Sequence, residues 1–246
     1  LKVEKTASVD GEKKAGLKAL LTELKGGSIS EETKQRAAKF FQAIDATTLG
    51  LVEQELIREG VSHDEIRKSL CDIHLEALKD SLVAQRIEVA PPHPVNTLME
   101  EHKFIMESLN KLTSIVTRLK EKKSYADFGE DLEELKGVAH HLVDAENNHQ
   151  REEDALFPRL HKHDVVEPPE IMKLDHVEFR KRKQELFKIS NNHEDYPFDA
   201  FKEKVIEIGE YLPRELESHI FKEDNILYQI ALQVLKPEEW DEVKKE

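Results

Sequence analysis

The chain has 246 residues, of which 36% are charged and 38% hydrophobic, and its formal net charge is −14. This length allows one large domain or two small ones. The acidic balance argues against a nucleic-acid partner, because binding to phosphates requires clustered positive charge. The chain has only 9 Gly and 9 Pro. Its surplus of Glu, Lys and Leu predicts an all-α protein.

The cysteine content and the hydropathy pattern indicate where such a chain functions. Cys71 is the one cysteine and cannot form a disulfide within the chain, so a reducing compartment is the simplest inference. No run of about 18 apolar residues occurs, so we expect no membrane-spanning segment. The first residues, LKVEKTASVD, lack the apolar core of a signal peptide. We therefore expect a cytoplasmic protein that does not bind membranes.

The first third of the chain has the pattern of a small helical domain. Residues 1–14 show no apolar period and are expected to form a flexible tail. Residues 15–91 contain four short helical patterns, of which the third starts at Thr47 or Thr48 and ends at Gly60. The prolines of the segment VAPPHPV, residues 89–95, stop any helix there. We place a domain boundary at about residue 92.

Residues 92–246 contain four longer helical patterns. These patterns run from Asn96 to about Lys122, over roughly 125–162, from Pro168-Pro169 to about Asn191, and from about Asp199 to Leu235. Short links join them, which is typical of an antiparallel four-helix bundle. The predicted fold is therefore all-α, a four-helix bundle with a smaller N-terminal helical domain.

Four histidines lie on the inward-facing apolar stripes of these helices, one on each: His102, His149, His176 and His219. A single histidine in such a position is usually a buried side chain hydrogen-bonded to a neighbour. Glu153 and Glu223 each follow one of these histidines by four residues and so share its helix face. Four imidazoles and two carboxylates buried together are energetically costly unless something pairs them.

A metal centre would pair these groups. Imidazole and carboxylate ligands together suit iron, and manganese and zinc also fit. Six ligands exceed those of one tetrahedral zinc, and they better suit two ions about 3.5–4 Å apart with bridging carboxylates. The predicted metal ligands are His102, His149, Glu153, His176, His219 and Glu223.

Several stretches of the chain resemble a known family. Residues 96–235 resemble the hemerythrin HHE cation-binding domain, through EEHKF, HQREEDALFP, PPEIMKLDHVEFR and ESHIFKEDNILY. Residues 15–90 resemble an uncharacterised helical domain that often precedes such bundles, through LVEQELIREG and LCDIH. The resemblance implies a four-helix bundle that holds two non-haem iron ions. Oxygen-carrying members have a second histidine four residues after the third-helix one, where this chain has Arg180.

Two choices of ligand stay open. The spacing from His219 to Leu227-Tyr228, transferred to the second helix, selects Asn148 and Glu152 in place of His149 and Glu153. Asparagine is a poor ligand for iron, so we prefer the pair on the apolar stripe. Asp224 follows His219 by five residues, a spacing that the oxygen-carrying members also use, and it competes with Glu223. We prefer Glu223 because of the i, i+4 geometry.

These features predict a non-haem di-iron protein that handles or senses oxygen, nitric oxide or peroxide. The set of four histidines and two glutamates is similar to that of di-iron proteins linked to iron–sulfur cluster repair and nitric-oxide stress. One alternative is a redox- or oxygen-sensing adaptor that signals to a protein partner through the N-terminal helices. Another is a structural helical module with a degenerate metal site. The sequence leaves open whether the protein is an enzyme.

Overall fold

A computed structural model describes residues 46–62 and 86–245, together with Val83 and isolated positions before residue 41. Every regular element in these residues is a helix, which confirms the predicted all-α class. Most of the predicted tail, the expected helices before residue 46 and after residue 62, and Cys71 lie outside the described residues. None of the described helices is long and apolar enough to cross a membrane.

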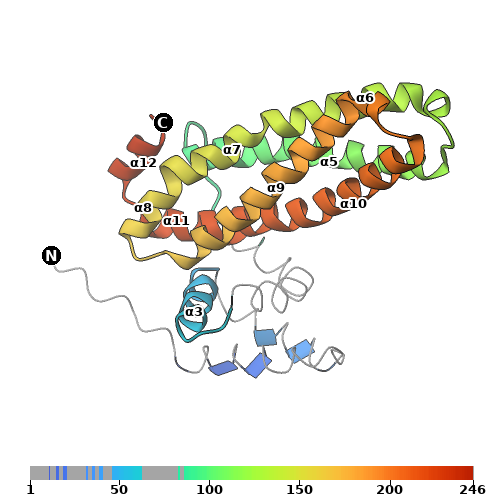
Figure 1. Ribbon diagram of the computed structural model, residues 1–246. Coiled ribbons are helices and arrows are strands. Elements are labelled where there is room, and N and C mark those ends of the chain that lie inside the picture. The colour runs from blue at the N-terminus through green and yellow to red at the C-terminus, as the bar shows by residue number, and fades with distance from the viewer. Residues whose placement is uncertain are drawn as a thin grey trace. The chain divides into compact units, whose positions relative to one another are not determined.

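The described helices are, in chain order, α3 (Ala46–Arg58), α5 (Pro94–Glu121), α6 (Tyr125–Asp144), α7 (Glu146–Arg151), the π-helix η1 (Glu152–Leu156), α8 (Phe157–Lys162), α9 (Glu167–Asn191), the 3-10 helix η2 (His193–Asp195), α10 (Phe198–Lys222), the π-helix η3 (Glu223–Leu227), α11 (Tyr228–Val234) and α12 (Pro237–Val243). The long helices α5, α6, α9 and α10 lie side by side (Figure 1). They occupy the four stretches in which the sequence predicts long helices, and they confirm the packed helical bundle.

Local sequence signals fix the ends of the long helices. Pro94 is the first residue of α5, where its missing N–H costs nothing, and the His93 ring accepts a hydrogen bond from the Val95 N–H at 3.2 Å. Ser124 caps α6, since its hydroxyl oxygen accepts a hydrogen bond from the Asp127 N–H at 3.3 Å. Pro168 and Pro169 lie in the first turn of α9. Two of these helices therefore begin at the prolines that end the preceding segments.

The core of the bundle is formed by the apolar stripes of α5, α6, α9 and α10. Twelve of its side chains are fully buried: Leu112, Ile115, Leu119, Phe128, Leu135, Ala139, Leu142, Leu186, Phe201, Val205, Ile208 and Leu212. At about 25 cal/mol per Å² of apolar surface, burial of these side chains is the main force that holds the helices together. The bundle therefore has a hydrocarbon interior along most of its length.

Two of the four long helical stretches contain a π-helical segment. In η1 the N–H of Phe157 donates to the carbonyl of Glu152, five residues earlier, and in η3 the N–H of Tyr228 donates in the same way to Glu223. The second stretch is also interrupted at Ala145, between α6 and α7. Segments of π-helix are rare and occur frequently at functional sites. Here both begin at a buried glutamate.

The chain divides into two compact units. One contains α3 with residues 160–171 and 222–235, and the other contains residues 89–159, 172–221 and 236–245. Within the first unit, α3 packs against η3 and α11, with Val52 and Leu56 fully buried. Gly60 follows α3 with a φ of 96°, a left-handed conformation that favours glycine, and it confirms the predicted helix stop. The predicted boundary at about residue 92 stays a prediction.

A close approach of α5 and α10 depends on Gly209. A Cβ atom added at this position would lie 2.4 Å from Cγ2 of Val116 and 3.5 Å from a methyl carbon of Leu112. Val116 is buried and β-branched, and in a helix such a side chain strongly prefers one χ1 rotamer. The absence of a side chain at residue 209 therefore sets the spacing of these two helices.

We expect Gly209→Ala to destabilise the protein despite the better helix propensity of alanine. The propensity gain is about 1 kcal/mol, whereas overpacking costs roughly 1–3 kcal/mol and here meets a rigid neighbour. The matched control is Gly137→Ala in α6, where nothing lies within 4 Å of the added atom and a small stabilisation is expected. Urea denaturation measures both variants. Equal stabilisation of the two would contradict the tight contact, and Val116→Ala should rescue Gly209→Ala.

Candidate metal centre

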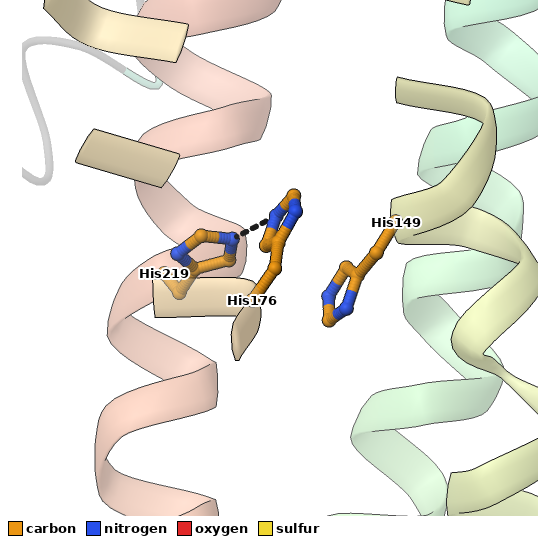
Figure 2. A group of neighbouring side chains, drawn as sticks. All are labelled: His149, His176 and His219. Carbon is orange, nitrogen blue, oxygen red and sulfur yellow. Dashed lines mark hydrogen bonds between the residues drawn. The ribbon is translucent and has the colours of Figure 1, made fainter. Parts of the chain in front are cut away.

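Three histidines from three helices meet in the interior of the bundle. His149 is on α7, His176 on α9 and His219 on α10, and each is at most 1% exposed. Figure 2 shows the rings of His149 and His176 facing each other, with His219 beside His176. The rings of His149 and His176 stack at a centroid distance of 4.0 Å and an interplanar angle of 7°. One ring nitrogen from each of the three histidines lies within 4.8 Å of the others.

Two buried carboxylates join this group of imidazoles. Glu152 and Glu223 are fully buried, and each offers an oxygen within 4.8 Å of the other and of a nitrogen of His176. Oε2 of Glu152 lies 3.5 Å from Nε2 of His176. Both glutamates are the first residues of the π-helical segments, η1 and η3. His176 belongs to both groups of side chains and so connects the histidines to the carboxylates.

The Nδ1 atom of each histidine faces a carboxylate of its own. His176 Nδ1 lies 2.9 Å from Oε1 of Glu153, and His219 Nδ1 lies 3.2 Å from Oδ2 of Asp175. His149 Nδ1 lies 3.5 Å from Oε2 of Glu146. Nε2 of His176 and Nε2 of His219 point toward each other at 3.0 Å.

The carboxylates favour one tautomer of each ring, whereas the contact between the Nε2 atoms of His176 and His219 needs a proton or a cation between them. A carboxylate against Nδ1 favours a proton there and leaves the Nε2 lone pair free for another partner. Histidines that ligate metals almost always donate their other N–H to a carboxylate, carbonyl or water. Glu153 and Asp175 therefore orient Nε2 of His176 and of His219 for use as ligands.

Two cationic side chains of α9 hold two of the three outer carboxylates, Glu146 and Glu153, in place. The Arg180 guanidinium donates to Oε1 of Glu146 at 2.8 Å and lies 3.2 Å from Oε1 of Glu153. The ammonium of Lys183, a residue only 2% exposed, lies 2.6 Å from Oε2 of Glu146. Arg180 thus links the carboxylate beside His149 to the one beside His176. Arg180 occupies the position at which the resemblance described in the sequence analysis implies a histidine in oxygen-carrying members.

The charges around the outer carboxylates shift their pKa values. Burial alone would raise the pKa of Glu146, but its contacts with His149 and Lys183 outweigh this and lower the pKa to about 2. The pKa of Glu153 is lowered first by its hydrogen bond to His176 and then by Arg180, against the effect of burial. Both side chains are therefore carboxylates at neutral pH.

The structure brings together four of the six predicted ligands: His149, His176, His219 and Glu223. Glu153 lies outside the two groups and faces Nδ1 of His176 and Arg180, and Glu152 occupies the inner position. His102 on α5 is buried, but among the described residues it belongs to neither group. Asp224 is half-buried beside the fully buried Glu223. The ligand set itself stays a prediction.

For the second helix, the sequence offered two ligand pairs, His149 with Glu153 and Asn148 with Glu152, and the structure places one member of each pair at the centre. His149 from one pair and Glu152 from the other lie at the centre, and Asn148 is also buried, at 1% exposure. Sequence reasoning missed Glu146 and Asp175 altogether. The signal for Glu146 was local, because Glu146 precedes His149 by three residues and residues at this spacing share a helix face. Asp175 had no such signal, because the histidine that it faces, His219, lies on another helix.

The donor set fits a borderline divalent metal. Three imidazoles and two carboxylates are nitrogen and oxygen ligands of the kind that iron, manganese and zinc accept. Five carboxyl groups and two cationic side chains lie in or next to these groups: Glu146, Glu152, Glu153, Asp175 and Glu223, with Arg180 and Lys183. Carboxylates buried in this way are energetically costly unless they are paired, and a bound cation would pair those at the centre.

A buried cluster of histidines and glutamates inside packed antiparallel helices defines a cation-binding bundle. Comparison with known families agrees: residues 93–231, more than half of the chain, match the hemerythrin HHE cation binding domain. The chain therefore belongs to the hemerythrin HHE family. Residues 17–84 match a family of unknown function, DUF438. No curated protein matches the chain.

We expect Glu146→Gln to lower the stability of the metal-free protein at neutral pH and to remove part of its acid sensitivity. A carboxylate with a folded-state pKa near 2 and an ordinary value of 4.5 stabilises the fold above pH 4.5. This stabilisation is lost as the pH falls from 4.5 toward 2. At about 1.4 kcal/mol per pKa unit, it is at most on the order of 3 kcal/mol. Urea denaturation between pH 3 and 7 measures it.

The matched control is Glu133→Gln, which changes a carboxylate that is 73% exposed and pairs only at the surface with Lys136. We expect this variant to follow the pH dependence of the unaltered protein. If Glu146→Gln followed it as well, the pairing of Glu146 with Lys183 and His149 would make no contribution to stability.

Proposed function

We propose that this protein is a non-haem di-iron protein whose centre reacts with oxygen, nitric oxide or peroxide. The observation that carries the proposal is the pair of overlapping ligand groups, three imidazoles and two carboxylates with His176 in common. Two six-coordinate ions have more coordination positions than these five side chains can fill, so positions would remain for an exogenous ligand. Glu152 and Glu223 lie close enough to each other to bridge two ions in the way that carboxylates do in two-metal sites.

The chain's own residues would hold and insulate such a centre. His176 and His219 present Nε2 inward, while Glu153 and Asp175 hold the proton on each Nδ1. Phe157 and Phe179 pack against the histidine rings, at centroid distances of 5.8 Å from His176 and 5.0 Å from His219. These apolar rings keep bulk water away from the imidazoles. When bound, the iron would supply the redox chemistry that none of these side chains provides.

The first prediction from this proposal concerns the metal content of the protein and the carboxylate ligands of the metal. We expect the untagged protein to hold up to two iron ions per chain, measured by elemental analysis, and Glu152→Gln to lose metal. Glu153→Gln is the matched variant, since it makes the same change one residue away at the carboxylate that faces Nδ1 of His176. Loss of an outer hydrogen bond of this kind weakens metal affinity by about 10–100-fold without removing a ligand.

Three outcomes separate the hypotheses. Metal loss in Glu152→Gln with retention in Glu153→Gln supports the arrangement described above. The reverse result would show that the second helix uses His149 and Glu153, as the apolar stripe predicts. Less than one metal ion per chain in the unaltered protein, with no other metal bound, would leave a structural helical module.

The second prediction concerns reactivity. We expect the reduced, iron-loaded protein to remove nitric oxide or peroxide from solution, as followed with an electrode, and His176→Ala to abolish this removal. His176 belongs to both ligand groups, so its loss should affect both ions. Glu133→Gln serves as the control with an unaltered centre. Unchanged concentrations of oxygen, nitric oxide and peroxide in the presence of loaded protein would contradict the proposed chemistry.

A second candidate function, sensing, has an observation in its favour. Helix α3 packs on η3, the segment that begins with Glu223, and Gln54 of α3 is 4% exposed. The Gln54 amide donates to the Asp164 carbonyl at 3.0 Å and accepts from the Val166 N–H at 2.9 Å. A change at η3 would thus reach α3 directly. Under this alternative the ligand changes amide exchange in α3, and nothing is consumed.

A further inference from the structure

A pocket with a volume of about 1080 Å³ lies on the bundle between α5 and the segment from α6 to η1. Apolar side chains form part of its wall, including the buried Ile105 and Phe104, which is 68% exposed. Its polar lining is more unusual, because it reaches a fully buried amide. That amide belongs to Asn148, which is 1% exposed.

The side-chain oxygen of Asn148 accepts no hydrogen bond from any described residue. The amide nitrogen of the same side chain donates to Oε2 of Glu101 at 3.0 Å and lies 3.5 Å from the Leu98 carbonyl. Turning the amide over would bring its oxygen against these two acceptors, so the observed orientation is the favourable one. A buried acceptor without a donor costs roughly 1–3 kcal/mol. An unsatisfied acceptor therefore belongs to a side chain that lines this pocket.

The charged lining of the pocket is acidic. Four carboxylates face two cationic side chains: Glu101, Glu107, Asp144 and Asp154 against Lys111 and Arg151. Arg151 is paired with Glu101, and the Asp154 carboxylate accepts a hydrogen bond from Gln150 at 2.7 Å. His141 also lines the pocket. Clefts with one dominant sign of charge raise the local concentration of the opposite ion and its rate of association.

The pocket is also adjacent in sequence to candidate ligands. Glu101 directly precedes His102 on α5, and Asn148 directly precedes His149 on α7. Carboxylate, amide-carbonyl and imidazole groups can each ligate a divalent metal ion. The lining therefore offers such an ion weak ligands from the rim to the buried floor.

We propose that this pocket is the port through which a divalent metal ion enters the bundle, with the Asn148 oxygen as its last ligand before His149. This inference rests on the proposed metal centre. The rim carboxylates attract the hydrated ion, and the unsatisfied amide oxygen replaces part of its hydration shell. An asparagine at this position binds the ion more weakly than a histidine would, which suits a residue that must release it.

The test measures the rate of metal uptake. The metal-free protein of 246 residues is mixed with Co²⁺ at low ionic strength, and its visible absorption is followed by stopped flow. The variant Glu107→Gln, Asp144→Asn, Asp154→Asn removes three negative charges from the rim. We expect its uptake to be slower by about ten-fold, with the same final metal content, and the difference to vanish at high salt.

The matched control is Glu121→Gln, Glu130→Gln, Glu203→Gln, which removes three charges from exposed positions that do not line the pocket. A second variant, Asn148→Leu, removes the acceptor without changing the charge and should slow uptake at every salt concentration. Thermal unfolding checks that each variant folds.

Rates equal to those of the control, with full metal content, would overturn the port and leave the metal centre standing. Asn148→Leu loading at the unaltered rate would overturn the role of the amide. No stable binding of Co²⁺ or iron by the unaltered protein would overturn the port and the proposed function together.

Discussion

The constraint on which this structure depends is the burial of ionisable groups inside a hydrocarbon core. His149, His176, His219, Glu152 and Glu223 are each at most 1% exposed. Removing a carboxylate from water costs several kcal/mol unless charges and hydrogen bonds compensate for it. The fold can bear this cost because twelve fully buried apolar side chains along the same helices contribute the opposing free energy. The bundle is therefore stable enough to hold a polar cluster that by itself would favour unfolding.

The free-energy cost of burying these ionisable groups is offset by two layers of charged side chains around them. Outside the imidazoles lie Glu146, Glu153 and Asp175, and outside two of these lie Arg180 and Lys183. Each layer restricts the one inside it, since a carboxylate fixed by a cation has one position in which to accept the Nδ1 proton. Arg180 contacts Glu146 and Glu153, the carboxylates that face His149 and His176. A single residue of α9 therefore fixes the hydrogen-bond partners of two histidines on different helices. Rigidity at the centre thus depends on residues that would touch no metal.

The fold could be predicted from the sequence far better than the details of the site. Prolines at 94, 168 and 169 and regular apolar stripes defined the long helices, because these signals act within one helix. The choice between Glu152 and Glu153 could not be made in this way. The apolar stripe from Leu142 to Leu156 crosses an interruption at Ala145 and a π-helical turn. A helical wheel assumes an uninterrupted α-helix, so it places the residues beyond these points on the wrong face. The role of Arg180 could not be predicted either, since its partners Glu146 and Glu153 lie on another helical stretch.

The two π-helical segments have a consequence for how this site can change over evolution. Each contains one more residue than an α-helical turn would, and each starts with a buried glutamate. In an ordinary helix, deletion of one residue rotates everything beyond it by about 100° and is rarely tolerated. In η1 or η3 the same deletion would instead restore regular α-helix. The identity of the inward carboxylate is therefore set by chain length at these two turns, and a new ligand arrangement is one codon away from the present one.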